Sequence, residues 1–176
     1  YLDVSRVPSS KSLDDITSSL SVIISLLSKE ASQEIVLDGF ASLFSKQSKN
    51  IEELQQKLTN AFATSSTTSN YNKTNTNVSI RLALGSDTKI INAIINAYQN
   101  YTKITPLPKI GLIIDYSKGK ITDVSQQVAE IISIGGKVTF AKDQISSYGI
   151  TNGTTKNSGP LAINLQSVSI NLPRLA

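Results

Sequence analysis

The chain has 176 residues, a formal net charge of +4 and a sequence pI near 9.2, and it contains no Cys, His, Met or Trp. This length, with 39% hydrophobic residues, suffices for one domain with its own core. The missing residue types exclude zinc sites of the usual kind, Ser-His-Asp and Cys-His pairs, disulfides and thiyl radicals. Only carboxylates and carbonyls could hold a metal ion such as magnesium or calcium, and we predict no cofactor.

The N-terminal residue is Tyr1 and the chain has no Met, so we expect a processed chain or an excerpt of a longer one. The longest apolar stretch, residues 20–27, is interrupted by two serines. A membrane span needs roughly 20 residues, so we predict none.

Charge is distributed unevenly along the chain. Residues 1–60 carry six basic and eight acidic side chains (−2), and residues 61–176 carry eleven and five (+6). The basic half raises nucleic acid as a partner. However, its lysines are spread singly and no aromatic residues interleave with them as a stacking platform would require. An ordinary solvated surface is therefore the favoured interpretation, and nucleic acid is only a second alternative.

The first 62 residues are predicted to be helical. Capping signals and apolar stripes predict helices over residues 12–29 and 50–62, and a third helix is expected over 34–45 despite Gly39. Residues 63–77 are almost wholly Ser, Thr and Asn, which predicts a polar linker outside the core.

Residues 78–176 predict an α/β segment, because strand and helix patterns alternate along it. The order β-α-β-α-β with short connections favours parallel strands, either as part of an α/β barrel or as a mostly parallel sheet, with the whole chain one domain as an open alternative. The expected strands are residues 78–84, 109–115, 137–140 and 166–172, and the expected helices are residues 87–100 and 123–133.

Three features of this segment have both a functional and a structural interpretation. Gly135-Gly136 lies after a helix and before a strand, which favours a helix C-cap over a phosphate loop. Asp115 closes a buried strand and could bind magnesium or a ribose hydroxyl, or be an ordinary strand-end acid. The polar residues 148–159 form either a substrate loop or a flexible surface loop, and both interpretations stay open.

Four Asn-X-Ser/Thr sequons occur, at Asn72, Asn77, Asn100 and Asn152. With the absence of Cys they permit a secreted, glycosylated protein. Cysteine-free chains equally suit the cytosol, particularly in thermophiles, which avoid labile residues. We predict a cytoplasmic protein, with an extracellular one as the alternative.

The end of the chain, Leu165-Gln-Ser-Val-Ser-Ile-Asn-Leu-Pro-Arg-Leu-Ala176, resembles a segment of anaerobic (class III) ribonucleoside-triphosphate reductases that reads as a strand ending in Asn-Leu-Pro-Arg-Ile/Leu-Ala. Weaker similarity runs upstream through Asp38-Gly-Phe40, residues 51–54, residues 79–82 and residues 106–111. The resemblance implies successive parts of the catalytic α/β barrel of that family.

The resemblance also implies what this chain lacks. Enzymes of the family form a thiyl radical on a cysteine a little before the Asn-Leu-Pro-Arg segment, generated by a glycyl radical near the far C-terminus. The matching residues 148–159 contain no cysteine, and neither a glycyl-radical segment nor the zinc-binding cysteines of the family are present. We therefore predict that this chain alone does not reduce ribonucleotides and has no catalytic residue.

The leading hypothesis is a non-catalytic or partial relative of that reductase, which keeps weak nucleotide binding or serves a structural or assembly role. Its partners would be a nucleotide, a second copy of the chain or a larger reductase-like assembly. The alternative is a secreted or cell-surface structural module rich in Ser, Thr and Asn. The predicted ligand site lies at the carboxyl ends of the strands, and its residues are Asp115, Thr151, Asn152, Asn171 and Arg174.

Overall fold

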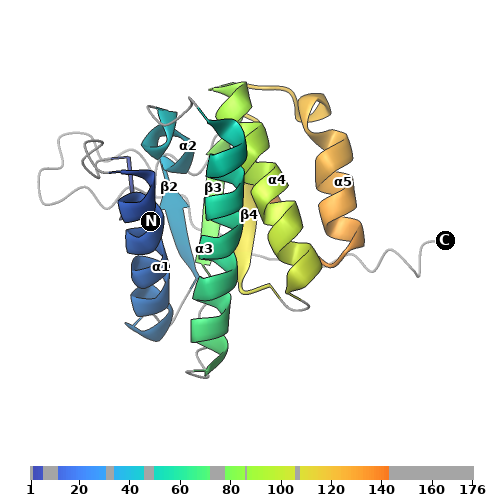
Figure 1. The fold of residues 1–176 in the computed structure, drawn as a ribbon. Helices are drawn as coiled ribbons and strands as arrows, with labels where there is room; N and C mark the ends of the chain where they lie inside the picture. The colour runs from blue at the N-terminus through green and yellow to red at the C-terminus, as the bar shows by residue number, and fades with distance from the viewer. Residues whose placement is uncertain are drawn as a thin grey trace, which may run out of the picture.

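The computed structural model describes residues 2–5, 12–30, 34–45, 50–71, 78–85, 87–105 and 108–142. Its centre is a five-stranded sheet in which every neighbouring pair is parallel and the strands lie in chain order (Figure 1). The strands are β1 (Leu2–Asp3), β2 (Ile35–Asp38), β3 (Val78–Ala83), β4 (Ile110–Asp115) and β5 (Val138–Ala141). The predicted α/β class with parallel strands is confirmed.

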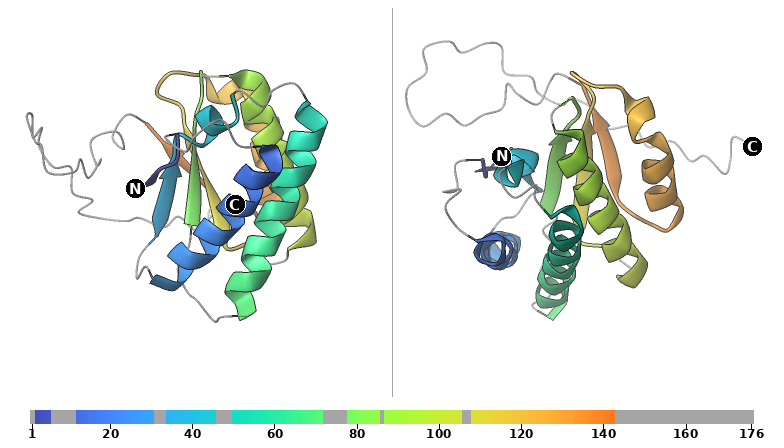
Figure 2. Two further views of the ribbon diagram at one scale, coloured as in Figure 1. Left: turned by 60° about the vertical axis from the view of Figure 1, so that its left-hand side comes forward. Right: turned by 45° about the horizontal axis from the view of Figure 1, so that its top comes forward.

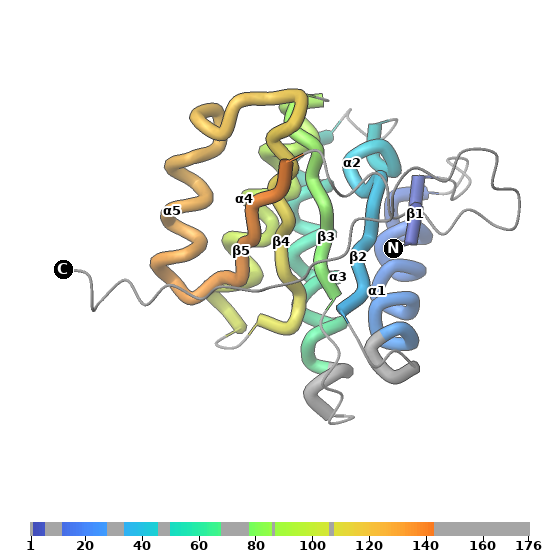
Figure 3. Tube along the Cα trace, turned by 180° about the vertical axis from the view of Figure 1, so that it is seen from behind, coloured from blue at the N-terminus to red at the C-terminus, as the bar shows by residue number. Residues whose placement is uncertain are grey.

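The helices cover one face of this sheet. They are α1 (Leu13–Glu30), the short α2 (Phe40–Leu43), α3 (Ile51–Tyr71), α4 (Thr88–Ile104), the 3-10 turn Ile121–Asp123 and α5 (Ser125–Ser133). α1 packs against α3, α3 against α4, and α4 against α5 (Figure 2). Right-handed crossovers between parallel strands in sequential order place every connecting helix on the same side. Seen from behind, the strands therefore lie in front of α1, α3, α4 and α5 (Figure 3).

The core lies between the strands and the helices. Ile80 and Leu82 of β3 and Leu112 and Ile114 of β4 are at most 1% exposed and belong to the same cluster as the apolar stripe of α4. Because side chains alternate across a strand, the residues between them face the side of the sheet that none of the described helices covers. Aromatic rings link the helices within the core, in edge or tilted contacts with centroids 5.3 to 6.5 Å apart, and they belong to Phe40, Phe44, Phe62, Tyr98 and Tyr101.

Helix starts follow the predicted capping signals. At the start of α1, the Ser12 hydroxyl accepts from the Asp15 backbone N–H and the Asp15 carboxylate accepts from the Ser12 backbone N–H. At the start of α3, Asn50 Oδ1 accepts from the Glu53 backbone N–H. Asp87 accepts from two backbone N–H groups at the start of α4. These bonds satisfy amides that a helix leaves unpaired at its first turn, so local sequence is enough to locate these boundaries.

Two predictions for the N-terminal 77 residues are wrong. Residues 35–38, expected within a helix, form β2, because the Ile35-Val-Leu segment pairs with β3 and its Leu37 is fully buried in the core. Residues 63–71, expected in a polar linker, continue α3 to Tyr71. Ser65 and Ser66 are buried there, since their hydroxyls bond the Ala61 carbonyl and the Tyr101 hydroxyl.

The predictions for residues 78–142 are confirmed. The helices expected at 87–100 and 123–133 are α4 and α5, and the three strands expected before residue 142 are β3, β4 and β5. Gly135 has a φ of 89° and ends α5 with its amide on the Ile132 carbonyl, which confirms the C-cap interpretation. The strand expected at 166–172 lies outside the described residues, as does the 148–159 loop.

Candidate functional site

Charged side chains gather at the carboxyl ends of the strands, on the face of the sheet that no described helix covers. Asp3 of β1 is in register with Asp38 of β2, and Arg81 of β3 and Asp115 of β4 follow on the next two strands. Each of the three aspartates is the last residue of its strand. In parallel α/β folds this carboxyl edge is where ligands bind, because the loops that follow the strands converge there.

The Arg81 side chain on β3 links the carboxylates at the ends of β2 and β4. Its Nη1 donates to Asp38 Oδ2 at 2.9 Å, and its Nη2 donates to Asp115 Oδ2. The side chains of Arg81 and Asp115 are 9% and 3% exposed, whereas that of Asp38 is 38% exposed. The guanidinium and Asp115 therefore lie buried, whereas Asp38 is the partly exposed member of this network.

The third nitrogen of the guanidinium, Nε, has no hydrogen-bond partner. Arg81 Nε is buried and makes no hydrogen bond. A buried N–H without an acceptor destabilises a fold by about 1–3 kcal/mol, and such groups are rare in native proteins. Among the described residues of this edge, structural pairing therefore leaves the orphaned Nε–H unexplained.

The Oδ1 atom of each of the three aspartates accepts hydrogen bonds from the loop that follows its strand. Asp3 Oδ1 accepts from the Ser5 amide and hydroxyl, and Asp115 Oδ1 accepts from the Ser117 amide and hydroxyl in the same arrangement. Asp38 Oδ1 accepts from the Gly39 amide at 2.8 Å. In Asp38 and Asp115 one oxygen thus orders a loop while the other faces Arg81, so loops and guanidinium are positioned together.

Electrostatics keep Asp115 ionised. Burial raises the pKa of its carboxyl, but hydrogen bonds from Ser117 and from Arg81, with the Arg81 charge, outweigh burial and hold the pKa below its usual value. Asp115 therefore cannot serve as a proton donor near neutral pH. Counted over these three described side chains alone, the formal charge is −1.

A second polar row crosses the same face at the amino ends of the strands. Ser79 is 2% exposed and donates to the Glu34 carboxylate, which also lies 3.7 Å from Lys137 Nζ. Gly111 lies beneath this row, and a Cβ there would be 2.9 Å from the Ser79 hydroxyl. All donors of this row that the structure describes have acceptors, so we interpret it as structural.

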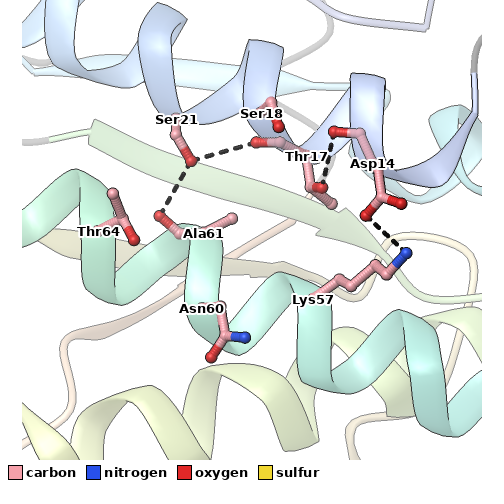
Figure 4. Close-up of a pocket in the computed structure, with 8 residues that line it drawn as sticks. All are labelled: Asp14, Thr17, Ser18, Ser21, Lys57, Asn60, Ala61 and Thr64. Carbon is pink, nitrogen blue, oxygen red and sulfur yellow. Dashed lines mark hydrogen bonds and ion pairs between the residues drawn. The ribbon is translucent and has the colours of Figure 1, made fainter.

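A polar groove of about 400 Å³ lies elsewhere, on the outer surface between α1 and α3 (Figure 4). It is lined by Asp14, Thr17, Ser18, Ser21, Lys57, Asn60, Ala61 and Thr64. The ammonium of Lys57 pairs with Asp14 at 2.6 Å and with Glu53 at 2.8 Å, and Ser21 donates to backbone carbonyls of both helices. These contacts join α1 to α3. The charged side chains that line the groove, Asp14 and Lys57, are paired with each other, so we assign no ligand to it.

Metal binding and membrane insertion find no support in the described ranges. No group of three or more acidic side chains there is arranged to hold a metal ion. No helix among the described residues is both long and apolar enough to cross a membrane.

Of the predicted site residues, the structure places only Asp115, at the carboxyl end of β4. Thr151, Asn152, Asn171 and Arg174 lie outside the described residues. Sequence reasoning missed Arg81 and Asp38. The alternation of 78–84 already put Arg81 opposite the core residues, but Asp38 could be recognised only with β2 identified as a strand.

The sequon at Asn100 bears on the alternative of a secreted, glycosylated protein. Asn100 lies within α4, and its Thr102 is 3% exposed with the hydroxyl on the Tyr98 carbonyl. The sequons at Asn72, Asn77 and Asn152 lie outside the described residues. The buried Thr102 is thus already explained by helix packing.

Comparison of the chain with protein-family models, with curated proteins and with solved structures found no match.

Proposed function

We propose that this chain is a non-catalytic ligand-binding domain whose site lies at the carboxyl ends of β2, β3 and β4, around Arg81. The sequential parallel sheet with helices on one side has the arrangement of a sector of an α/β barrel, in which this end of the strands carries the ligand. The loops after β2 and β4 are fastened to the same carboxylates that hold the guanidinium.

The orphaned Nε–H of Arg81 is the observation that carries this proposal. A purely structural ion network would be expected to use all its buried donors, because an unmet one lowers stability. Asp38 is the member of the network that a ligand can reach from solvent, since its side chain is 38% exposed. A ligand oxygen that accepts from Nε would give this buried N–H the acceptor that it lacks.

The absence of catalysis is part of the proposal for two reasons. The chain has no Cys or His to act as nucleophile or neutral-pH base. Asp115 is kept ionised by Arg81 and Ser117, so it is not a general acid. Both arguments agree with the resemblance to anaerobic ribonucleotide reductases, because this chain lacks the radical cysteine of that family.

Nucleotide is one candidate ligand under this proposal. Lys118 and Lys120 are exposed in the turn that follows β4, where a phosphate could contact them. The resembling segment itself, residues 165–176, lies outside the described residues. A structural or assembly role without a small ligand is the alternative, and it predicts that nothing binds near Arg81.

A thermal-shift screen tests the proposal. Purified chain and its Arg81→Lys variant are scanned with nucleotides, sugars, amino acids and divalent cations at 1–20 mM, a range chosen for ligands of about millimolar affinity. At least one probe should raise the Tm of the wild type and raise that of the variant less, since binding stabilises only the folded form. No shift with any probe, or equal shifts in both proteins, would leave only the structural role.

A further inference from the structure

The face of the sheet that no described helix covers is nevertheless shielded from solvent on its inner strands. Val36 of β2, Ser79 of β3 and Ile113 of β4 lie on this face and are 7%, 2% and 6% exposed. Thr139, in register with Ile113 on the edge strand β5, is exposed. Neighbours in the same sheet shield the flanks of a side chain and leave its outer end open. The apolar Val36 and Ile113 therefore require atoms above the sheet.

The strand pairing leads to the same requirement. Every described pair of neighbouring strands is parallel, and sheets of this kind occur almost only with both faces covered. All six residues of β4 are buried, those facing the helices and those facing away from them alike. The sheet is therefore the middle of three layers, and the described helices account for one of the two outer layers.

The length of the chain segments outside the described ranges identifies the other layer. Within the chain these gaps span at most six residues and are tied to described elements at both ends, whereas 34 residues follow Lys142. Crossing five strands takes about 19 Å, close to the full reach of six extended residues. A short gap therefore cannot cross the sheet and return. Residues 143–176 can, and they start directly after β5.

We infer that the helix-free face of the sheet is the docking surface of residues 143–176 of the same chain. The composition of this segment suits the mixed face, because large apolar side chains alternate there with small or polar ones. The apolar members are Leu161, Ile163, Leu165, Val168, Ile170 and Leu172. They pack on Val36 and Ile113, while Ser and Asn between them meet the polar side chains of the face. The inference does not depend on a ligand at Arg81, since Val36 and Ile113 belong to neither of its ion pairs.

The absence of cysteine from the chain permits a direct test by NMR. Ser167→Cys in the full-length chain accepts a single nitroxide spin label, which broadens the signals of nearby methyl groups. The Ile113 and Val36 methyl signals should lose most of their intensity. Those of Val22 and Leu26, exposed on α1 in the helix layer, should keep most of theirs. The same intensity loss at both pairs, or none at either, would overturn the inference.

Two controls distinguish this docking from other arrangements. A label on Thr67→Cys, exposed on α3, should broaden Ile113 and Val36 much less than the label at position 167, because α3 lies on the opposite side of the sheet. Spin-labelled chain without isotopes is also mixed with isotope-labelled chain without the spin label. Broadening of Ile113 in this mixture would show that a second copy covers the face. Strongest broadening at Phe140 and Ile134 would place the segment beside β5 instead, and either result overturns the inference.

A soluble paramagnetic probe tests the shielding without any substitution. A neutral gadolinium chelate added to the unaltered chain should broaden the Val22 and Leu26 methyl signals and leave those of Val36 and Ile113 largely unchanged. Equal broadening of all four would show that the face is open to solvent, and the inference would be wrong. The thermal-shift screen at Arg81 has a separate readout, so the proposed function and this inference can fail independently.

Discussion

The backbone amide of Lys137, at the start of β5, donates to the hydroxyl of Tyr98 on α4 at 3.1 Å. The same hydroxyl donates to the Ile110 carbonyl at 2.8 Å, so one side chain joins the first residue of β4 to the residue that precedes β5. Tyr98 is fully buried, and burial raises the pKa of its hydroxyl well above the ordinary value. The phenol therefore stays protonated and available as a donor over the whole range in which the protein is handled.

Tyr98→Phe should lower the free energy of unfolding by about 1–3 kcal/mol, because it leaves the buried Ile110 carbonyl and the partly buried Lys137 amide without their partner. Urea unfolding followed by circular dichroism measures the change. Tyr116→Phe is the matched control, since the half-buried Tyr116 hydroxyl makes no hydrogen bond with the described residues. Equal effects of the two substitutions would contradict the role assigned to Tyr98.

Arg81→Met should destabilise the fold by about 3–5 kcal/mol, because it leaves the buried Asp115 carboxylate without a counter-charge. Adding Asp115→Asn to this variant should recover part of the loss. A double-mutant cycle from urea denaturation therefore gives a favourable coupling between the two positions. Strict additivity of the two substitutions would show that they act independently.

Stability should depend on Asp115 at acid pH in a defined direction. Its pKa is held below the unfolded value of 3.8, so its contribution is fully present above that value and is lost as pH falls through the lower folded pKa. Between pH 5 and pH 2 the wild type should therefore lose more stability than Asp115→Asn. Parallel urea titrations across this range measure it, and identical pH profiles would contradict the lowered pKa.

Gly39→Ala should destabilise more than Gly135→Ala. Both glycines have positive φ, 71° and 89°, which by itself disfavours alanine by about 1–2 kcal/mol. Only at Gly39 would the new Cβ lie 2.8 Å from Ser5 Cβ and 2.9 Å from Asp3 Oδ1, whereas nothing lies within 4 Å at Gly135. The difference in unfolding free energy, measured by urea titration, reports the close approach of the loops after β1 and β2.

Ribonucleotide reduction should be undetectable with the purified chain. The assay supplies an activating radical enzyme, formate and strict anaerobiosis, and deoxynucleotide is measured by chromatography. The physical reason is that the thiol that would carry the radical is absent from the sequence. Introducing a cysteine within residues 150–154 should not restore activity of the 176-residue chain, because these residues include no glycyl-radical segment to oxidise it. Deoxynucleotide formation by the unaltered chain would refute this expectation.

Short-range signals were enough to predict much of this fold. The alternation of residues 78–84, the apolar run 109–115 and the caps at Ser12, Asn50 and Asp87 act within one turn or one strand. Each of these patterns has a local physical cause, either the period of the backbone or an amide that needs an acceptor. The α/β class and the position of Asp115 at a strand end followed from them.

Contacts between distant segments account for what the patterns did not reveal. Ile35–Asp38 is too short to show a period and becomes a strand only by pairing with β3. Ser65 and Ser66 can lie in the interior because their hydroxyls find partners there. Ser65 donates to the Ala61 carbonyl, and Ser66 shares a hydrogen bond with the Tyr101 hydroxyl. Arg81 meets Asp38 and Asp115 across 43 and 34 positions of sequence. The candidate site exists only once parallel pairing sets these three strands side by side, because hydrogen bonds and burial depend on distance in space and not along the chain.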